Sequence, residues 1–275
     1  MKAAPLFEIV PNLSEGRDAA TIDAAAAAVS RTGARLIDRS SDAMHHRSVL
    51  TIVGSAEQVL DAAVALAGIA LDRIDLRAHR GAHPRTGALD VLPFVPLAGA
   101  GLPEAAALAH RAGAEIWRRY RIPSFYYGAA ALRGERTLLP DIRRNADWLP
   151  DEGDVTRHYS AGAIVIGARE LLIAFNVELK SDDLGAAVQI ARTVRGRDGG
   201  LRSLRALAFP RGEGRVQVSL NVTDYAATPL YRVVELIRGL AAERGIEVLG
   251  CELVGCLPWG AVEATAAYYL GVSNL

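Results

Sequence analysis

The chain repeats one order of short apolar runs and helix-forming segments, and this order limits the folds that it can adopt. In the first half, runs with strand character lie at 6–10, 35–38, 49–53 and 88–95. Apolar residues with helical spacing fill the intervals at about 18–30 and 55–74. Apolar residues recur at different spacings in strands and in helices, so their spacing along the sequence distinguishes the two. The first half therefore predicts the βαββαβ order of a ferredoxin-like domain.

The same order of elements starts again in the second half. Strands are predicted at 171–179, 204–209, 216–222 and 247–253, and helices at about 183–194 and 230–242. A helix at 103–120 and a short C-terminal helix extend the two halves. We expect a mixed α/β (α+β) fold of two ferredoxin-like βαββαβ subdomains, at 1–178 and 179–275, with a cleft between them. The segment 133–160, rich in Arg, Asp and Pro, is predicted to wrap the surface.

The composition excludes several classes of partner. Lys plus Arg and Asp plus Glu both number 31 among 275 residues, so no net charge attracts nucleic acid or an anionic membrane. No apolar run reaches the roughly 18 residues of a membrane span, and Pro5, Glu8 and Pro11 interrupt any signal peptide. Cys251 and Cys256 are too few for a disulfide framework. We expect a cytoplasmic protein that binds small molecules, without nucleic-acid or membrane partners.

Histidines gather around the loop before the strand at 88–95. Four of the six histidines are His45, His46, His79 and His83. Pro84 restricts the backbone of His83 to extended geometry, while Gly81 and Gly87 permit close turns on either side. An imidazole titrates near pH ~6.5 and can take and return a proton near neutrality. His83 is therefore a candidate general base and acid, although a loop histidine beside a proline can also be structural.

A metal site is the alternative use of these histidines. His79 and His83 are four residues apart, a spacing that suits a metal on a helix, although Gly81 and Pro84 disfavour a helix there. With His45 and His46 they could instead form the zinc or iron site of a hydrolase. Arginines also surround this loop in sequence, and a guanidinium is a natural clamp for a carboxylate, so an anionic substrate is expected. These arginines are Arg47, Arg77, Arg80 and Arg85.

Several sequence words, in one order along the chain, resemble the formiminotransferase domain of the glutamate formimidoyltransferase family. They are IVPNLSEGR at 9–17, HPRTGALDVLPFVPL at 83–97, YYGAAA at 126–131, RTLLPDIR at 136–143, GARELLIAFNVEL at 167–179, SLNVTDYAATPLY at 219–231 and ELVGCLPWGAV at 252–262. The resemblance implies two α/β subdomains with folate bound between them, and a homodimer. It also implies transfer of a formimidoyl group from N-formimidoyl-L-glutamate to N5 of tetrahydrofolate, the co-substrate, with no metal.

The resemblance also implies roles for particular residues. The catalytic histidine of the HPR word falls on His83. Residues expected to bind folate or the donor are Asn12, Asp38, Arg47, His46, Arg85 and Asp90. Ala82, Ala129 and Ser40 depart from the family pattern, which usually has carboxylates there. A carboxylate would stabilise a cationic, amidine-like donor, so its loss leaves open another donor, or a homologue that binds folate or another small molecule without transfer.

Overall fold

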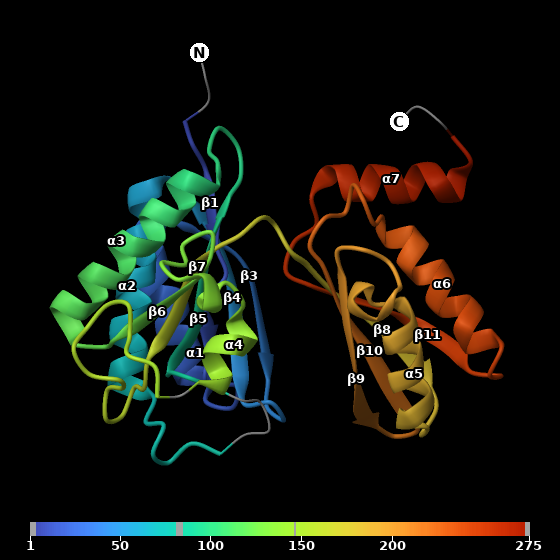
Figure 1. The fold of residues 1–275 in the computed structure, drawn as a ribbon, viewed down its shortest axis with the longest axis horizontal. Coiled ribbons are helices and arrows are strands. Elements are labelled where there is room, and N and C mark those ends of the chain that lie inside the picture. Colours follow the sequence, from blue (N-terminus) through green and yellow to red (C-terminus); the bar gives the residue numbers. More distant parts are fainter. Residues whose placement is uncertain (1–3, 81–84, 146, 273–275) are drawn as a thin grey trace. The chain divides into compact units, whose positions relative to one another are not determined.

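The structure is a computed structural model that describes residues 4–80, 85–145 and 147–272 (Figure 1). It contains two mixed α/β units, each with its own sheet, and the predicted fold class is confirmed. The units divide between Glu170 and Leu171. The expected boundary after residue 178 lies inside the strand β8, Ile173–Lys180. The cleft expected between the two halves stays a prediction.

The first unit follows the predicted order and then continues into two further strands. Its elements are β1 (Phe7–Ile9), β2 (Asn12–Leu13), α1 (Ala19–Ser30), β3 (Arg35–Asp42), β4 (Arg47–Gly54), α2 (Ala56–Arg73), β5 (Leu89–Pro96), α3 (Leu102–Tyr120), β6 (Ser124–Gly128), the 3-10 turn Gly134–Arg136, α4 (Leu139–Arg144) and β7 (Ile164–Ala168). β1 and β2 both lie between β4 and β5, so they act as one strand interrupted at Pro11, which has no N–H to donate. Neither β6 nor β7 is predicted from the sequence.

The sheet of the first unit combines two kinds of pairing. β3, β4, the interrupted strand β1–β2 and β5 pair antiparallel, in the arrangement of a ferredoxin-like sheet. β5, β7 and β6 then pair in parallel. Parallel strands need a crossover connection, and α3 belongs to the connection that leads from β5 to β6.

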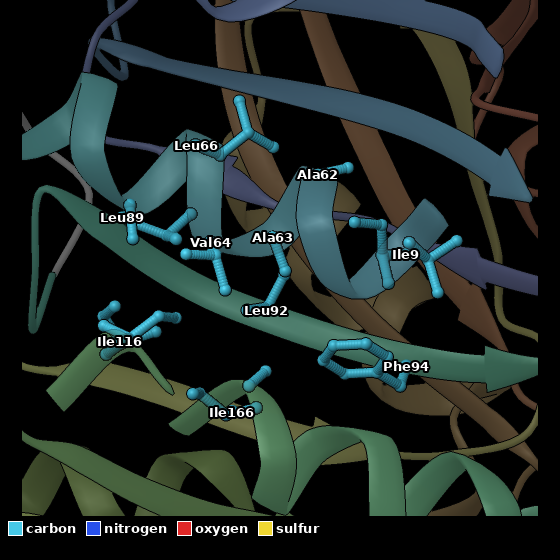
Figure 2. Packing of buried hydrophobic residues seen from close by; sticks show 14 of the residues in the cluster. Ile9, Ala62, Ala63, Val64, Leu66, Leu89, Leu92, Phe94, Ile116 and Ile166 are labelled. Atoms are coloured by element: carbon cyan, nitrogen blue, oxygen red, sulfur yellow. The ribbon is translucent and has the colours of Figure 1, made fainter. Parts of the chain in front are cut away.

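The main core of the first unit lies between the sheet and the helices α1, α2 and α3. Apolar residues at helical spacing on α2, including Ala63 and Leu66, belong to the same buried cluster as Leu92 and Phe94 of β5 (Figure 2). The start of α2 is fixed by Gln58, whose Oε1 accepts a hydrogen bond from Ser55 N at 2.9 Å. This core holds one face of the sheet, so any binding residues of the sheet must use its other face or its loops.

The second unit is a four-stranded antiparallel sheet covered by helices. Its elements are β8, α5 (Leu184–Val194), the 3-10 turn Gly196–Asp198, β9 (Leu204–Gly212), β10 (Arg215–Val222), α6 (Leu230–Ala242), β11 (Glu247–Val254) and α7 (Trp259–Leu270). The strand order β11-β8-β10-β9 is that of a ferredoxin-like sheet. The hairpin between β9 and β10 turns at Gly212 and Gly214, both with positive φ. The predicted strands and the helices between them are all present.

The segment 133–160 differs from its prediction. It does cover part of the first unit, but Arg136 is only 1% exposed and Ile142 is buried with Phe125 of β6. Its polar composition predicted solvent contact, whereas an ion pair inside the segment allows its charges to be buried. Among the helices of the described residues, none has both the length and the apolar character needed to cross a membrane.

Candidate functional site

A bulge in β5 places Asp90 on the sheet face opposite the helical core. Across the β2–β5 pair, Asn12 faces Val91 and Leu13 faces Leu89, so Asp90 has no opposite residue. Leu89 belongs to the helix-side core and Val91 to the cluster on the other face, although in a regular strand they would share a face. A bulge re-aims a side chain in this way, and here the side chain is a carboxylate.

The Asp90 carboxylate is almost completely buried and hydrogen-bonded on both oxygens. Oδ1 accepts from the backbone N–H of Thr86 at 2.6 Å and of Gly87 at 3.4 Å. Oδ2 accepts from Arg143 Nη2 of α4 at 2.5 Å. A buried charge is tolerable only when it is paired in this manner. Asp90 therefore fixes the end of the loop that enters β5 and holds α4 to the sheet.

More positive than negative charge surrounds Asp90. Burial lowers the pKa of Arg47, against the attraction of Asp90, and Arg143 and Arg85 lower it further by repulsion. Burial also lowers the pKa of Arg85, where Asp90 attracts and Arg143 again repels. An arginine still keeps its charge, so several guanidinium groups share one carboxylate. This arrangement favours an anionic ligand.

His46 and His79 stack beside Arg85. Their ring centroids are 4.0 Å apart with an interplanar angle of 27°. Nη1 of Arg85 lies 2.7 Å from His79 Nδ1, and its guanidinium also donates to the backbone carbonyls of His45 and His46. Burial lowers the pKa of both His46 and His79, and Arg85 lowers that of His79 further. Both imidazoles are therefore neutral at pH 7, and they accept hydrogen bonds.

The turn Glu15–Gly16 packs against this histidine pair. Glu15 Oε1 lies 3.2 Å from His46 Nδ1, and the backbone N–H of Gly16 donates to the same ring nitrogen at 3.1 Å. A Cβ on Gly16 would lie 2.3 Å from the carbonyl oxygen of Asp42, so only glycine fits between the turn and the hairpin of β3 and β4. The left-handed backbone of His46, with φ 51°, completes that hairpin.

The described histidines do not gather around a common centre for a metal ion. His45 Nδ1 pairs with Asp42 Oδ2 at 2.8 Å, whereas His46 and His79 contact Glu15 and Arg85. Over the described parts of the chain, no group of three or more His, Cys, Asp or Glu side chains could hold a metal ion. His83, the fourth member of the proposed hydrolase set, lies outside the described residues, as does Ala82.

Asn12 and Asp38 lie on the same sheet face as Val91. The strand register places Asn12 opposite Val49, and Val49 opposite Ser40. Asp38 is opposite Thr51, two residues along β4, and is half-buried. Asn12 Nδ2 donates to Val10 O at 2.7 Å, while its Oδ1 is buried without a hydrogen-bond partner among the described residues. Of the predicted residues, Arg47, Arg85 and Asp90 thus come together, and Asn12 and Asp38 share their face of the sheet.

Some residues of this region were not singled out from the sequence. Arg143 lies in the RTLLPDIR word at 136–143, which was a usable signal, but nothing in that word shows that it meets Asp90. Arg157 has no such signal. The other histidines lie apart: His110 of α3 is within hydrogen-bond distance of Ala130 O at 2.8 Å, and His158 accepts from the backbone of its own turn. Ala129 is exposed after β6.

The chain is a mixed α/β protein of two ferredoxin-like units, and the first unit has histidines and an excess of arginines around a buried carboxylate. The chain matches the N-terminal subdomain of the formiminotransferase domain over residues 6–169 and the formiminotransferase domain over residues 174–275. It therefore belongs to the formiminotransferase family, as the sequence words predicted.

Named relatives match over nearly the whole chain. Glutamate formimidoyltransferase of Streptococcus pyogenes serotype M1 is 38% identical, over 98% of this chain and 95% of the relative. Glutamate formimidoyltransferase of Thermoplasma acidophilum is also 38% identical, over 98% of this chain and 93% of the relative. Formimidoyltransferase-cyclodeaminase of Rattus norvegicus is 38% identical over 98% of this chain, which spans 53% of that longer protein.

Proposed function

We propose that this protein transfers a formimidoyl group from N-formimidoyl-L-glutamate to N5 of tetrahydrofolate. The observation that carries the proposal is the 38% identity with glutamate formimidoyltransferases along almost the full length of both chains. The excess of arginine around Asp90 supports it, because both substrates carry glutamyl carboxylates.

His83 is the proposed general base and acid. It takes the proton of N5 as that nitrogen bonds to the formimidoyl carbon, which becomes tetrahedral. It then returns the proton to the glutamate nitrogen as the bond between that nitrogen and the same carbon breaks. Glutamate leaves and formimidoyltetrahydrofolate remains. One imidazole thus serves both halves of the reaction, with no net change in protons.

The described residues fit the rest of this chemistry. Arg85 and Arg143 supply guanidinium groups for carboxylates, and the neutral His46 and His79 accept hydrogen bonds without adding positive charge. Asn12 Oδ1 is a buried acceptor without a partner among the described residues, and a pterin ring presents N–H donors that would satisfy it. Asn12 is therefore the residue that we assign to the pterin.

A homodimer in the cytoplasm, active in histidine breakdown and one-carbon metabolism, completes the proposal. Large apolar side chains on α7 and β11 support association, because an exposed apolar patch on a soluble domain marks an interaction surface. Trp259 is 71% exposed, Leu270 69% and Leu253 41%.

The decisive experiment is a turnover assay of the purified protein with N-formimidoyl-L-glutamate and tetrahydrofolate, run beside N-formyl-L-glutamate as a competing donor. We expect release of glutamate and formation of formimidoyltetrahydrofolate, faster than any formyl transfer.

A folate-binding homologue that has lost transfer is the other candidate function. Ser40 and Ala129 favour it, because they stand where the family usually has carboxylates. Calorimetric binding of tetrahydrofolate without turnover of either donor would reject the transferase and favour that binder.

A further inference from the structure

A small pocket in the first unit is lined by three arginines. Arg85, Arg143 and Arg157 surround a volume of about 60 Å³ together with Phe125 and Thr86. A single water occupies about 30 Å³ in the liquid, so the pocket accepts a group of a few heavy atoms and no fused ring. Arg157 also lines a neighbouring open depression of about 480 Å³ that includes Trp117 and Tyr159.

Two of these three arginines, Arg143 and Arg157, keep N–H groups that the described residues do not bind. Arg143 pairs with Asp90, yet its Nε is buried without a hydrogen-bond partner among the described residues. Arg85 is attracted by the carboxylate of Asp90 and repelled by Arg143. Arg157 makes no hydrogen bond or ion pair within the described part of the chain. The pocket therefore offers three guanidinium groups and one shared carboxylate.

We infer that this pocket binds a carboxylate of the formimidoylglutamate donor, an inference that rests on the proposed function. A planar carboxylate matches the paired N–H groups of guanidinium in shape and charge. It also matches the volume of the pocket, which is too small for a pterin.

The position of the pocket along the chain favours the donor over the glutamate tail of folate. Arg85 is two residues after His83, the proposed base. In the donor, both carboxylates are within a few bonds of the nitrogen that leaves. In tetrahydrofolate, the aminobenzoyl group separates the glutamate from the reacting N5. A carboxylate anchored beside the catalytic loop is therefore the donor's.

The test compares Arg157→Gln with Arg144→Gln, using steady-state kinetics for both substrates. Arg144 is the matched control, because it is an exposed arginine of α4 that pairs with Asp141 and does not line the pocket. We expect Arg157→Gln to raise KM for N-formimidoyl-L-glutamate about ten- to a hundredfold, the usual effect of losing a charged hydrogen bond. The KM for tetrahydrofolate and kcat stay near wild type, Arg157→Lys restores part of the loss, and Arg144→Gln changes neither KM.

The outcomes separate this inference from the proposed function. If the wild type transfers the group but Arg157→Gln leaves the donor KM unchanged, or raises the KM for tetrahydrofolate instead, the inference is overturned and the transferase stands. If the wild type shows no turnover, the transferase fails and calorimetry with L-glutamate tests the pocket alone. Tenfold weaker binding in Arg157→Gln would then support a carboxylate site, and equal binding, or none to the wild type, would reject it.

Discussion

In the first unit the leading strand is divided into β1 and β2 at Pro11, whereas its counterpart in the second unit, β8, is a continuous strand of eight residues. β8 pairs with β10 without a register shift. The divided strand coincides with a bulge opposite it, at Asp90, and with the turn that carries Glu15. The last strand of the second unit, β11, also has a bulge against β8, where Leu249 is the extra residue. The same irregularity therefore carries a carboxylate only in the first unit, where the divided strand and its turn frame a candidate site.

The connections that enter the last ferredoxin-like strand show the same contrast. Residues 74–88 lead from α2 to β5 and contain His79, His83 and Arg85. Residues 243–246 make the equivalent connection from α6 to β11 and form a tight turn at Gly245. The proposed chemistry thus falls where the first unit lengthens a loop that the second keeps short, which agrees with the general placement of functional residues on loops held by rigid elements.

The largest expected difference between these two connections is in catalysis. His83→Ala should lower kcat about a hundred- to ten-thousandfold, because general acid–base catalysis is typically worth that much. The matched variant Arg244→Ala, in the short connection of the second unit, should retain full activity. Turnover assays and circular dichroism on both proteins check this, and an active His83→Ala would remove the imidazole from the mechanism.

The next largest effect is expected from a buried ion pair of the first unit. Arg136 and Asp151 form an ion pair at 2.6 Å with side chains 2% and 1% exposed, and Arg136 lies against the rings of Phe125 and Trp148. Arg136→Met leaves the Asp151 carboxylate buried without this partner and should lower the free energy of unfolding by about 3–5 kcal/mol. Urea unfolding measures the change. Adding Asp151→Asn should recover part of it, and a double variant no more stable than the single one would contradict this account.

The response to pH should also belong to the first unit, because all six histidines lie within it. Burial lowers the pKa of His46 and His79, so the unfolded chain binds protons that the folded chain resists. Stability from these groups is complete above pH ~6.5, the unfolded value, and is lost as pH falls through the lower folded values. Urea unfolding at pH 7.5 and pH 5.5 should show this loss. The free energy of unfolding should depend less steeply on pH in the double variant His46→Gln/His79→Gln. An unchanged pH dependence would show that other groups cause the loss of stability.

The smallest effect is expected from an ion pair of the second unit. Lys180 and Glu247 lie 3.1 Å apart, but their side chains are 65% and 64% exposed. Solvent screens such a pair, so Lys180→Gln should change the free energy of unfolding by no more than about 1 kcal/mol. Urea unfolding measures this change. A loss of unfolding free energy as large as that of Arg136→Met would show that burial does not determine how much an ion pair stabilises the protein.

The comparison also explains which elements the sequence could predict. The second unit and the first ferredoxin-like part alternate apolar and polar residues clearly enough to be located. β6 and β7 did not stand out, because both are five residues long and almost wholly buried, which removes the alternation that marks a half-exposed strand. Their remaining signals were the aromatic run Phe125–Tyr127 and the branched run Ile164–Ile166.

The site was predictable only as a set of residue types. The family resemblance identified Arg47, Arg85 and Asp90, which the fold brings together. The contact of Asp90 with Arg143, 53 positions later, depends on tertiary packing of a segment whose charges suggested a surface. No local pattern encodes such a distant pair, and the same holds for the pocket that Arg157 joins.

The extra residue at Asp90 has a consequence for how the chain can change in length. It lets Leu89 face the helices while Val91 faces the opposite side of the sheet, although residues two positions apart in a regular strand share a face. Deleting Asp90 itself would leave Leu89, Val91 and Leu92 on their present faces and remove only the buried carboxylate, whereas deleting a residue from the regular part of the strand would reverse every side chain on one side of the cut. The loop at 97–101, beyond the strand, has no such constraint. Inserted or lost residues should therefore be tolerated after β5 and not within it.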